Sequence, residues 1–242
     1  MSPIQIGKTG LLFDGLDERL DDLRQQFDRE HYVRLPELLE PSLLSFIQTE
    51  IERGEFYERT HAGIKSNKEL CMKQNGVYGA LLLIMNDERL FRVIRSITRC
   101  GPIGCFEGRV YQVIPGRGHH DAWHGDIAED RLVAMSLNLS TEVYAGGTLQ
   151  IRDSTSGRII SEAPNVGYGD SIVFRLSPQL QHRITEIEGT TRKTAFAGWF
   201  RAKPDFLSLL KGIRQPNDLS KRTEAVDPAF GKGSFAVETF AD

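Results

Sequence analysis

The sequence predicts an α+β protein, mainly β, in which a helical N-terminal part packs against an antiparallel sandwich or jelly roll. Between about residues 16 and 99, hydrophobic residues recur at helical intervals. The character of the chain changes at Gly101 and Pro102. From there to residue 200, short segments rich in Val, Ile, Phe and Thr are separated by turn residues, a pattern typical of antiparallel β folds.

Two stretches of the N-terminal half are predicted to form helices. Residues 37–53 follow a proline and place leucines and isoleucines at helical spacing. Because proline suits the first turn of a helix, Pro41 predicts that the regular helix begins there. Residues 87–97 present a second apolar face. The polar stretch 63–76 between them is expected to be a loop.

The second half of the chain is expected to form short strands. Pairs of Gly, Pro, Asn and Asp mark turns between the β-rich segments. The expected strands cover residues 106–114, 132–139, 147–152, 171–175 and 194–201.

Length and composition favour one globular domain. The chain has 242 residues, of which 40% are hydrophobic and 26% charged, which is enough apolar material for a full core. We expect a single domain, with residues 1–100 as a mainly helical support, 101–201 as the β core and 202–242 as a C-terminal tail. A net charge of −3 and the absence of basic runs argue against a nucleic-acid partner.

We expect no secretory signal and no membrane-spanning segment from the sequence. The N-terminus lacks a basic region followed by an apolar run, and the longest apolar stretch, residues 79–85, is too short to cross a bilayer. The three cysteines are odd in number and are not spaced as a zinc pair. We therefore expect a cytoplasmic protein, monomeric or homodimeric, with reduced thiols, no membrane contact and a small-molecule partner.

The chemistry is expected in the β region. His124 and Asp126 are two residues apart, so on an extended segment both side chains point to the same face. His182 is the only histidine downstream and can supply a third ligand from another strand. Two histidines and one carboxylate on one side of an ion form the facial triad of iron(II) oxygenases, which leaves coordination positions open.

A second pair with the same spacing, His119 and Asp121, lies just upstream. We favour His124 and Asp126 because the small Gly125 between them relieves crowding. His119 and His120 are then interpreted as a polar loop at the rim of the pocket.

Ten residues after His182, Arg192 and Thr194 share one face of an expected strand. A guanidinium with a neighbouring hydroxyl suits the far carboxylate of a dicarboxylic acid. A keto acid end on the metal and a carboxylate end on Arg192 together describe 2-oxoglutarate. Tyr111, on the preceding strand, can add a phenol hydrogen bond to that carboxylate.

This ordered set of residues resembles the 2-oxoglutarate/iron(II) dioxygenase superfamily, and within it the prolyl-hydroxylase-like branch and its bacterial small-molecule hydroxylases. The resemblance covers roughly residues 100–201. It implies a double-stranded β-helix with the metal in its mouth, Fe(II) as cofactor, and 2-oxoglutarate and O₂ as cosubstrates. The residues that carry it are Tyr111, Pro115-Gly116, His124-x-Asp126, Arg131, Gly146 to Leu149, Gly169-Asp170, Phe174, His182, Gly189, Arg192-x-Thr194 and Trp199-Phe200.

The resemblance also bears on the reaction. Related halogenases have a small residue in place of the carboxylate of Asp126, so its presence favours hydroxylation or another C–H oxidation. Arg109, Trp123, Arg131 and Phe174 are candidates for the pocket or the substrate, although a salt bridge for Arg131 and core packing for the two aromatic residues are equally compatible with the sequence.

We expect a 2-oxoglutarate-dependent hydroxylase that acts on a small molecule, such as an amino-acid derivative or a natural-product intermediate. A prolyl-hydroxylase-like enzyme acting on a protein or peptide is the alternative within the same class. Outside it, a cupin-like metal protein without 2-oxoglutarate and a non-catalytic sensor remain as rivals. The spacing of Arg192 and Thr194 argues against the first rival, and the intact ligand set argues against the second.

Overall fold

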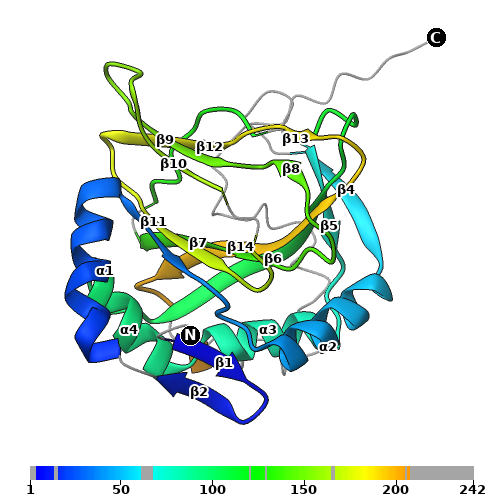
Figure 1. Ribbon diagram of the computed structural model, residues 1–242, viewed down its shortest axis with the longest axis horizontal. Coiled ribbons are helices and arrows are strands. Elements are labelled where there is room, and N and C mark those ends of the chain that lie inside the picture. The colour runs from blue at the N-terminus through cyan, green and yellow to red at the C-terminus, as the bar shows by residue number, and fades with distance from the viewer. Residues whose placement is uncertain are drawn as a thin grey trace.

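The computed structural model describes residues 4–13, 16–60, 68–119, 121–128, 130–164, 167–204 and 206–207. In these residues a large antiparallel sheet lies between a layer of helices and a smaller sheet (Figure 1). Figure 1 shows the helices along the lower and left sides of the large sheet, and β9, β10 and β12 above it. This arrangement confirms the expected jelly roll with helical support.

The large sheet has seven strands, and every pairing in it is antiparallel. Its central strands pair over long stretches, whereas β3 and β4 form the edges. In spatial order the strands are β3 (Tyr32–Leu35), β11 (Ser171–Arg175), β7 (Arg131–Asn138), β14 (Lys193–Arg201), β6 (Cys105–Val113), β5 (Lys68–Met72) and β4 (Phe56–Thr60).

The small sheet has three antiparallel strands and faces the large one across the site. Its strands are β10 (Ile159–Ala163), β9 (Leu149–Asp153) and β12 (Leu180–Ile184), in that spatial order. Two short pairs complete the described sheets: β8 (Ala145–Gly146) with β13 (Ile187–Glu188), and β1 (Ile4–Gly7) with β2 (Gly10–Phe13).

The four described helices are α1 (Leu16–Glu30), α2 (Pro41–Glu52), α3 (Gly76–Met85) and α4 (Glu88–Thr98). Their ends follow from local chemistry. Pro41 opens α2, where its missing N–H costs nothing. The side chain of Asn75 accepts from the N–H of Tyr78 at 3.0 Å and so caps α3. Asp87 accepts from the N–H of Arg89 at 2.8 Å and caps α4.

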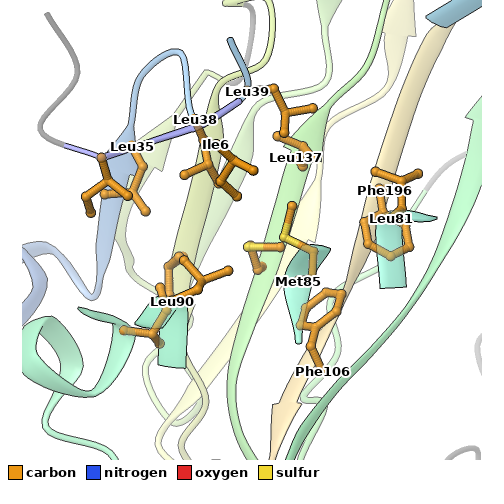
Figure 2. Close-up of a cluster of buried hydrophobic side chains, with 14 of the residues drawn as sticks. Ile6, Leu35, Leu38, Leu39, Leu81, Met85, Leu90, Phe106, Leu137 and Phe196 are labelled. Atoms are coloured by element: carbon orange, nitrogen blue, oxygen red, sulfur yellow. The ribbon is translucent and has the colours of Figure 1, made fainter. Parts of the chain in front are cut away.

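Alternation along β14 divides the interior into two cores. Phe196 and Phe200 point to the helices and pack in the larger core, which Figure 2 shows around Leu81, Met85 and Phe106. Trp199 points to the opposite side and packs in the smaller core between the two sheets, with residues such as Ile151 and Phe174. The metal-binding candidates lie on this second side.

Most of the expected elements are present. The helices begin and end close to the expected residues, and the five expected strands correspond to β6, β7, β9, β11 and β14. The expected loop at 63–76 is wrong in part, because Lys68–Met72 forms β5 and pairs with both β4 and β6. Of the expected tail, only residues 202–204 and 206–207 lie within the described part. None of the described helices combines the length and the apolarity that a membrane span requires.

The larger core yields a stability prediction. Phe196 is fully buried and its ring lies 5.5 Å from that of Phe106 and 6.4 Å from that of Tyr78. We expect Phe196→Ala to lower the free energy of unfolding by about 3–5 kcal/mol, because it removes these contacts and leaves a cavity. Urea denaturation measures this. Phe46→Ala, at an α2 position that is 52% exposed, is the control and should change stability by less than about 0.5 kcal/mol. Equal losses in the two variants would contradict the core assignment.

Candidate metal centre

The structure brings His124, Asp126 and His182 together between the two sheets. One ligand atom from each of them lies within 4.8 Å of the others. Nε2 of His182 is 3.4 Å from one carboxylate oxygen of Asp126, and Nε2 of His124 is 3.7 Å from the other. Two imidazole nitrogens and one carboxylate oxygen thus converge on one point.

Backbone pairing explains why these residues meet. His124 and His182 form an isolated antiparallel bridge, with N–H to carbonyl distances of 3.1 Å and 2.9 Å. Directly opposed residues share a face, so both rings point inward, 4.4 Å apart between centroids. Gly125 is not what selects this pair, because an added Cβ would come no closer than 3.7 Å to the carbonyl of Leu180. The bridge is the physical reason.

Hydrogen bonds orient the first histidine. Nδ1 of His124 lies 2.7 Å from the carbonyl oxygen of Ala122 and 3.4 Å from a carboxylate oxygen of Asp121. A proton on Nδ1 satisfies both acceptors and leaves the Nε2 lone pair for a metal. Asp121, from the upstream His-x-Asp pair, therefore supports the site instead of providing a ligand.

Asp126 is held as a carboxylate by its surroundings. The indole N–H of Trp199 donates to one oxygen at 2.9 Å, and a guanidinium nitrogen of Arg131 lies 3.5 Å from the other. Burial by itself raises the pKa of Asp126. Hydrogen bonding and positive charge from His182, with further charge from His124 and Arg131, outweigh it and hold that pKa well below its usual range.

The donor set fits a divalent transition metal. Two neutral imidazoles and one carboxylate on one side of an ion are the ligands that non-haem iron(II) uses, and no thiolate is among them. The supporting hydrogen bonds to His124 and Asp126 are those that metal ligands need in order to keep their orientation.

A buried lysine lies on the same side of β14 as the metal candidates. Lys193 is 1% exposed, and its Nζ is 5.9 Å from the ring centroid of Tyr144. The described part of the chain offers this ammonium no carboxylate within salt-bridge distance. Burial lowers the pKa of Lys193 to about 8, although the charge of Asp121 opposes the shift. A buried cation without a paired carboxylate suits an anionic ligand.

The structure corrects the expectation for Arg192 and Thr194. Arg192 precedes β14 and has no position in its ladder, and Thr194 lies on the helix side of the strand with Phe196, away from the metal candidates. Arg192 is exposed and pairs with Glu52 at the end of α2. Thr194 is buried on the helix side, where its N–H bonds to the hydroxyl of Ser140 at 3.0 Å. A displacement of one residue along β14 puts Lys193 where Arg192 was expected.

The remaining wall of the site carries charged and polar groups. Tyr111 is buried and lies opposite Ala195, on the same face as Lys193. Arg109, two residues earlier, bonds through Nε to Glu69 at 2.5 Å, and its guanidinium lies 6.0 Å from the ring of Trp199. Cys71 lies opposite Tyr111, and its thiol is 3.3 Å from Glu69.

Other expected site residues have different surroundings. Arg131 is almost fully buried, bonds to the backbone oxygen of Asp126 at 3.3 Å and stacks on Trp199 at 3.6 Å, so it supports the site from behind. Phe174 packs against the ring of His182 at 4.8 Å. Trp123 does not line the pocket, because its ring contacts Arg152 and Arg183 on the outer face of the small sheet.

His119 is not a rim residue. It is 4% exposed, and its Nδ1 accepts a hydrogen bond from the N–H of Ile114 at 3.0 Å. His120 lies outside the described residues. Lys193 and Glu69 are the neighbours of the site that sequence reasoning missed. The alternation of β14 around Trp199 was the signal that could have located Lys193.

Comparison with known proteins agrees with this geometry. Residues 108–201 match the family model described as the 2OG-Fe(II) oxygenase superfamily. No curated protein matches the chain. A prolyl-4-hydroxylase from Pseudomonas putida superposes with a TM-score of 0.56 at 20% identity, covering 76% of this chain and 100% of that one. An oxidoreductase of the 2OG-Fe(II) oxygenase family from Burkholderia pseudomallei gives 0.57 at 15% identity, covering 77% and 92%.

HygX from Streptomyces hygroscopicus, with nickel, 2-oxoglutarate and hygromycin B bound, gives a TM-score of 0.54 at 14% identity, covering 76% of this chain and 88% of that one. The structural likenesses establish the fold. The family match adds the enzyme class. Together they confirm the resemblance to the 2-oxoglutarate/iron(II) oxygenases, the oxidoreductase class and the dependence on Fe(II), 2-oxoglutarate and O₂.

The buried lysine predicts a gain in stability when it is removed. We expect Lys193→Met to raise the free energy of unfolding of the metal-free protein by about 1–3 kcal/mol at neutral pH, because a desolvated ammonium is replaced by an apolar side chain. The pKa of Lys193 is about 8 in the folded protein and 10.5 in its ordinary state, so the unfolded chain binds more protons between these values. Wild-type stability therefore rises with pH across that window, and the advantage of the variant shrinks.

Urea denaturation at neutral pH and at about pH 10 measures both effects. The exposed Lys73, paired with Glu55, provides the control, since Lys73→Met should change stability by less than about 0.5 kcal/mol. A Lys193→Met protein that is less stable than wild type at neutral pH would contradict this account of the lysine.

Proposed function

We propose that the protein hydroxylates, or otherwise oxidises, an unactivated C–H bond of a small molecule such as an amino-acid derivative or a natural-product intermediate. The reaction is coupled to the decarboxylation of 2-oxoglutarate to succinate and CO₂. The observation that carries the proposal is the convergence of three side chains that could ligate a metal and one buried lysine, which no carboxylate of the described residues pairs, on the same space between two sheets.

His124, Asp126 and His182 are assigned as the iron ligands. When bound, iron and its cosubstrates supply the oxidising chemistry that no side chain offers. The Nδ1 contacts of His124 leave its Nε2 available to a metal, while Trp199 donates to Asp126 and Arg131 adds positive charge beside it.

Lys193 takes the role that the sequence suggested for Arg192. It binds the far carboxylate of 2-oxoglutarate, with Tyr111 placed one residue pair further along the same face to add a phenol hydrogen bond. Burial raises the pKa of both Tyr111 and Tyr144, so these phenols stay protonated and donate. An ammonium near the ring of Tyr144 and on the same face as Tyr111 favours a carboxylate over a neutral group.

The substrate is proposed to approach along the wall that carries Arg109 and Glu69. This ion pair faces the same space as Trp199, which contacts the metal ligand Asp126. Small-molecule chemistry is supported by two structural neighbours, HygX with hygromycin B bound and the epimerase SnoN from nogalamycin biosynthesis. Peptide hydroxylation is the second candidate, because a prolyl hydroxylase from Trichoplax adhaerens in complex with a peptide fragment has a TM-score of 0.51.

The metal and cosubstrate assignments can be tested together. Iron(II) and 2-oxoglutarate are added to purified protein without oxygen, and the visible charge-transfer band of the chelated keto acid is recorded. We expect the wild type to show the band and His124→Ala to lose it. Lys193→Met should need about 10–100-fold more 2-oxoglutarate for half-saturation, because a charged hydrogen bond is lost.

Arg192→Met is the matched control for Lys193→Met, since the two residues are adjacent and both cationic. It should saturate like the wild type. If Arg192→Met weakens binding and Lys193→Met does not, then Lys193 is not the carboxylate ligand. Absence of the band in iron-loaded wild type would remove the cosubstrate claim itself.

The affinity for 2-oxoglutarate should also depend on pH. Lys193 binds the carboxylate as an ammonium, and its pKa in the free protein is about 8. Affinity should therefore be constant below about pH 8 and fall above it, since deprotonated lysine must take up a proton before the anion binds. Tyr111, Tyr144 and Asp121 are the titratable groups around it. Burial raises the pKa of both tyrosines well above this window and also raises the pKa of Asp121.

Titrating the same band between about pH 7 and 9.5 measures this dependence. Lys193→Arg keeps its charge throughout that range and should flatten the profile, even if its absolute affinity differs. An equally steep fall in Lys193→Arg would mean that another group is titrating.

A further inference from the structure

The outer face of the small sheet carries a cross-strand network behind the metal centre. In β9 and β12, Ile151 and His182 oppose each other and both point inward. Residues on either side of them therefore point outward. On β9 these are Gln150 and Arg152, and on β12 they are Gln181 and Arg183.

These outward side chains bond across the strands. Nε of Arg183 donates to the side-chain oxygen of Gln150 at 2.7 Å, and the amide of Gln150 donates to Glu162 on β10. Arg152 donates through Nε and Nη2 to the side-chain oxygen of Gln181, at 2.9 Å and 2.6 Å. Both guanidinium groups are thereby held in one orientation by the sheet.

The indole ring of Trp123 lies against both guanidinium groups. The central carbon of Arg152 is 4.3 Å from the ring centroid, and that of Arg183 is 4.7 Å from it. Planar guanidinium groups stack favourably on an indole face. Trp123 comes directly before His124, so this contact ties the segment with two of the three metal-binding candidates to the sheet with the third.

The backbone link between these two parts is short. His124 and His182 form an isolated bridge, and the described residues 121–128 have no regular strand pairing on either side of it. Besides the bridge, single side-chain contacts tie this segment to its surroundings: Asp121 accepts from the N–H of Ile184 at 3.3 Å, and Asp126 accepts from Trp199. The stacked Trp123 adds a contact to the small sheet on the face opposite the rings.

We propose that Trp123 is a positioning residue of the metal centre, clamped by Arg152 and Arg183 so that His124 keeps its place relative to His182. Metal sites need their ligands held to within about 0.5 Å, and one isolated bridge does not provide that precision. The proposal rests on the part of the proposed function that assigns His124, Asp126 and His182 as metal ligands, and it adds a role for a residue outside that set.

The test measures metal binding without cosubstrate or turnover. Co(II) is titrated into metal-free protein by calorimetry, and the visible spectrum of the cobalt complex reports the coordination. Trp123→Ala is expected to raise the dissociation constant about tenfold or more, the effect typical of residues that orient metal ligands. Trp123→Phe keeps an aromatic face for the guanidinium groups and should recover most of the affinity. Arg183→Met should give a smaller loss.

Urea denaturation of the metal-free variants separates positioning from general destabilisation. Phe46→Ala, an exposed aromatic position on α2, is the control and should bind Co(II) as the wild type does. Wild-type affinity in Trp123→Ala, or a Trp123→Phe protein as weak as Trp123→Ala, would overturn the proposal. Should Trp123→Ala not fold, a folded Arg183→Met protein with wild-type affinity and an unchanged cobalt spectrum would overturn it as well.

Discussion

The two-residue alternation of β14 is the constraint on which the rest of the structure depends. This strand is paired with β6 from Lys193 to Arg201 and with β7 from Ala195 onward, so a residue in it cannot turn to the other face without breaking that pairing. Phe196 and Phe200 are thereby committed to the core under the helices. Trp199 and Lys193 are committed to the space between the sheets. The register of this one strand therefore determines both which residues pack in the core and which residues face the candidate site.

A hydrogen bond from a side chain of this strand fixes the position of Asp126 in the candidate metal centre. Trp199 donates to Asp126, and Arg131 both stacks on that indole and faces the same carboxylate. The two histidines are instead tied to each other by the backbone bridge. The large sheet therefore fixes the carboxylate and the small sheet fixes the imidazoles, so the centre forms only when the two sheets are at their proper separation.

Much of this could be predicted from the sequence. The strong β-formers of β7, β11 and β14 and the helical spacing in α2 and α4 gave their elements close to the observed bounds. The strand β5 was missed because Lys68 and Glu69 make it polar, and only its pairing with β6 reveals it. Lys193 was not considered, and Arg192 was expected in its place, for a related reason. The spacing of residues in the sequence located the strand. Which of its side chains point toward the site depends on the elements that pack against each face.

The wall beside the metal also contains sulfur. Cys71 stands opposite Tyr111, and burial together with the neighbouring charge of Glu69 raises the pKa of its thiol to about 12, in spite of Arg109. A thiol that stays protonated is a poor ligand for iron and a slow target for oxidants, because both reactions require the thiolate. Burial, reinforced by the charge of Glu69, therefore keeps this soft, oxidisable atom in its less reactive protonated form on the wall beside the candidate metal centre.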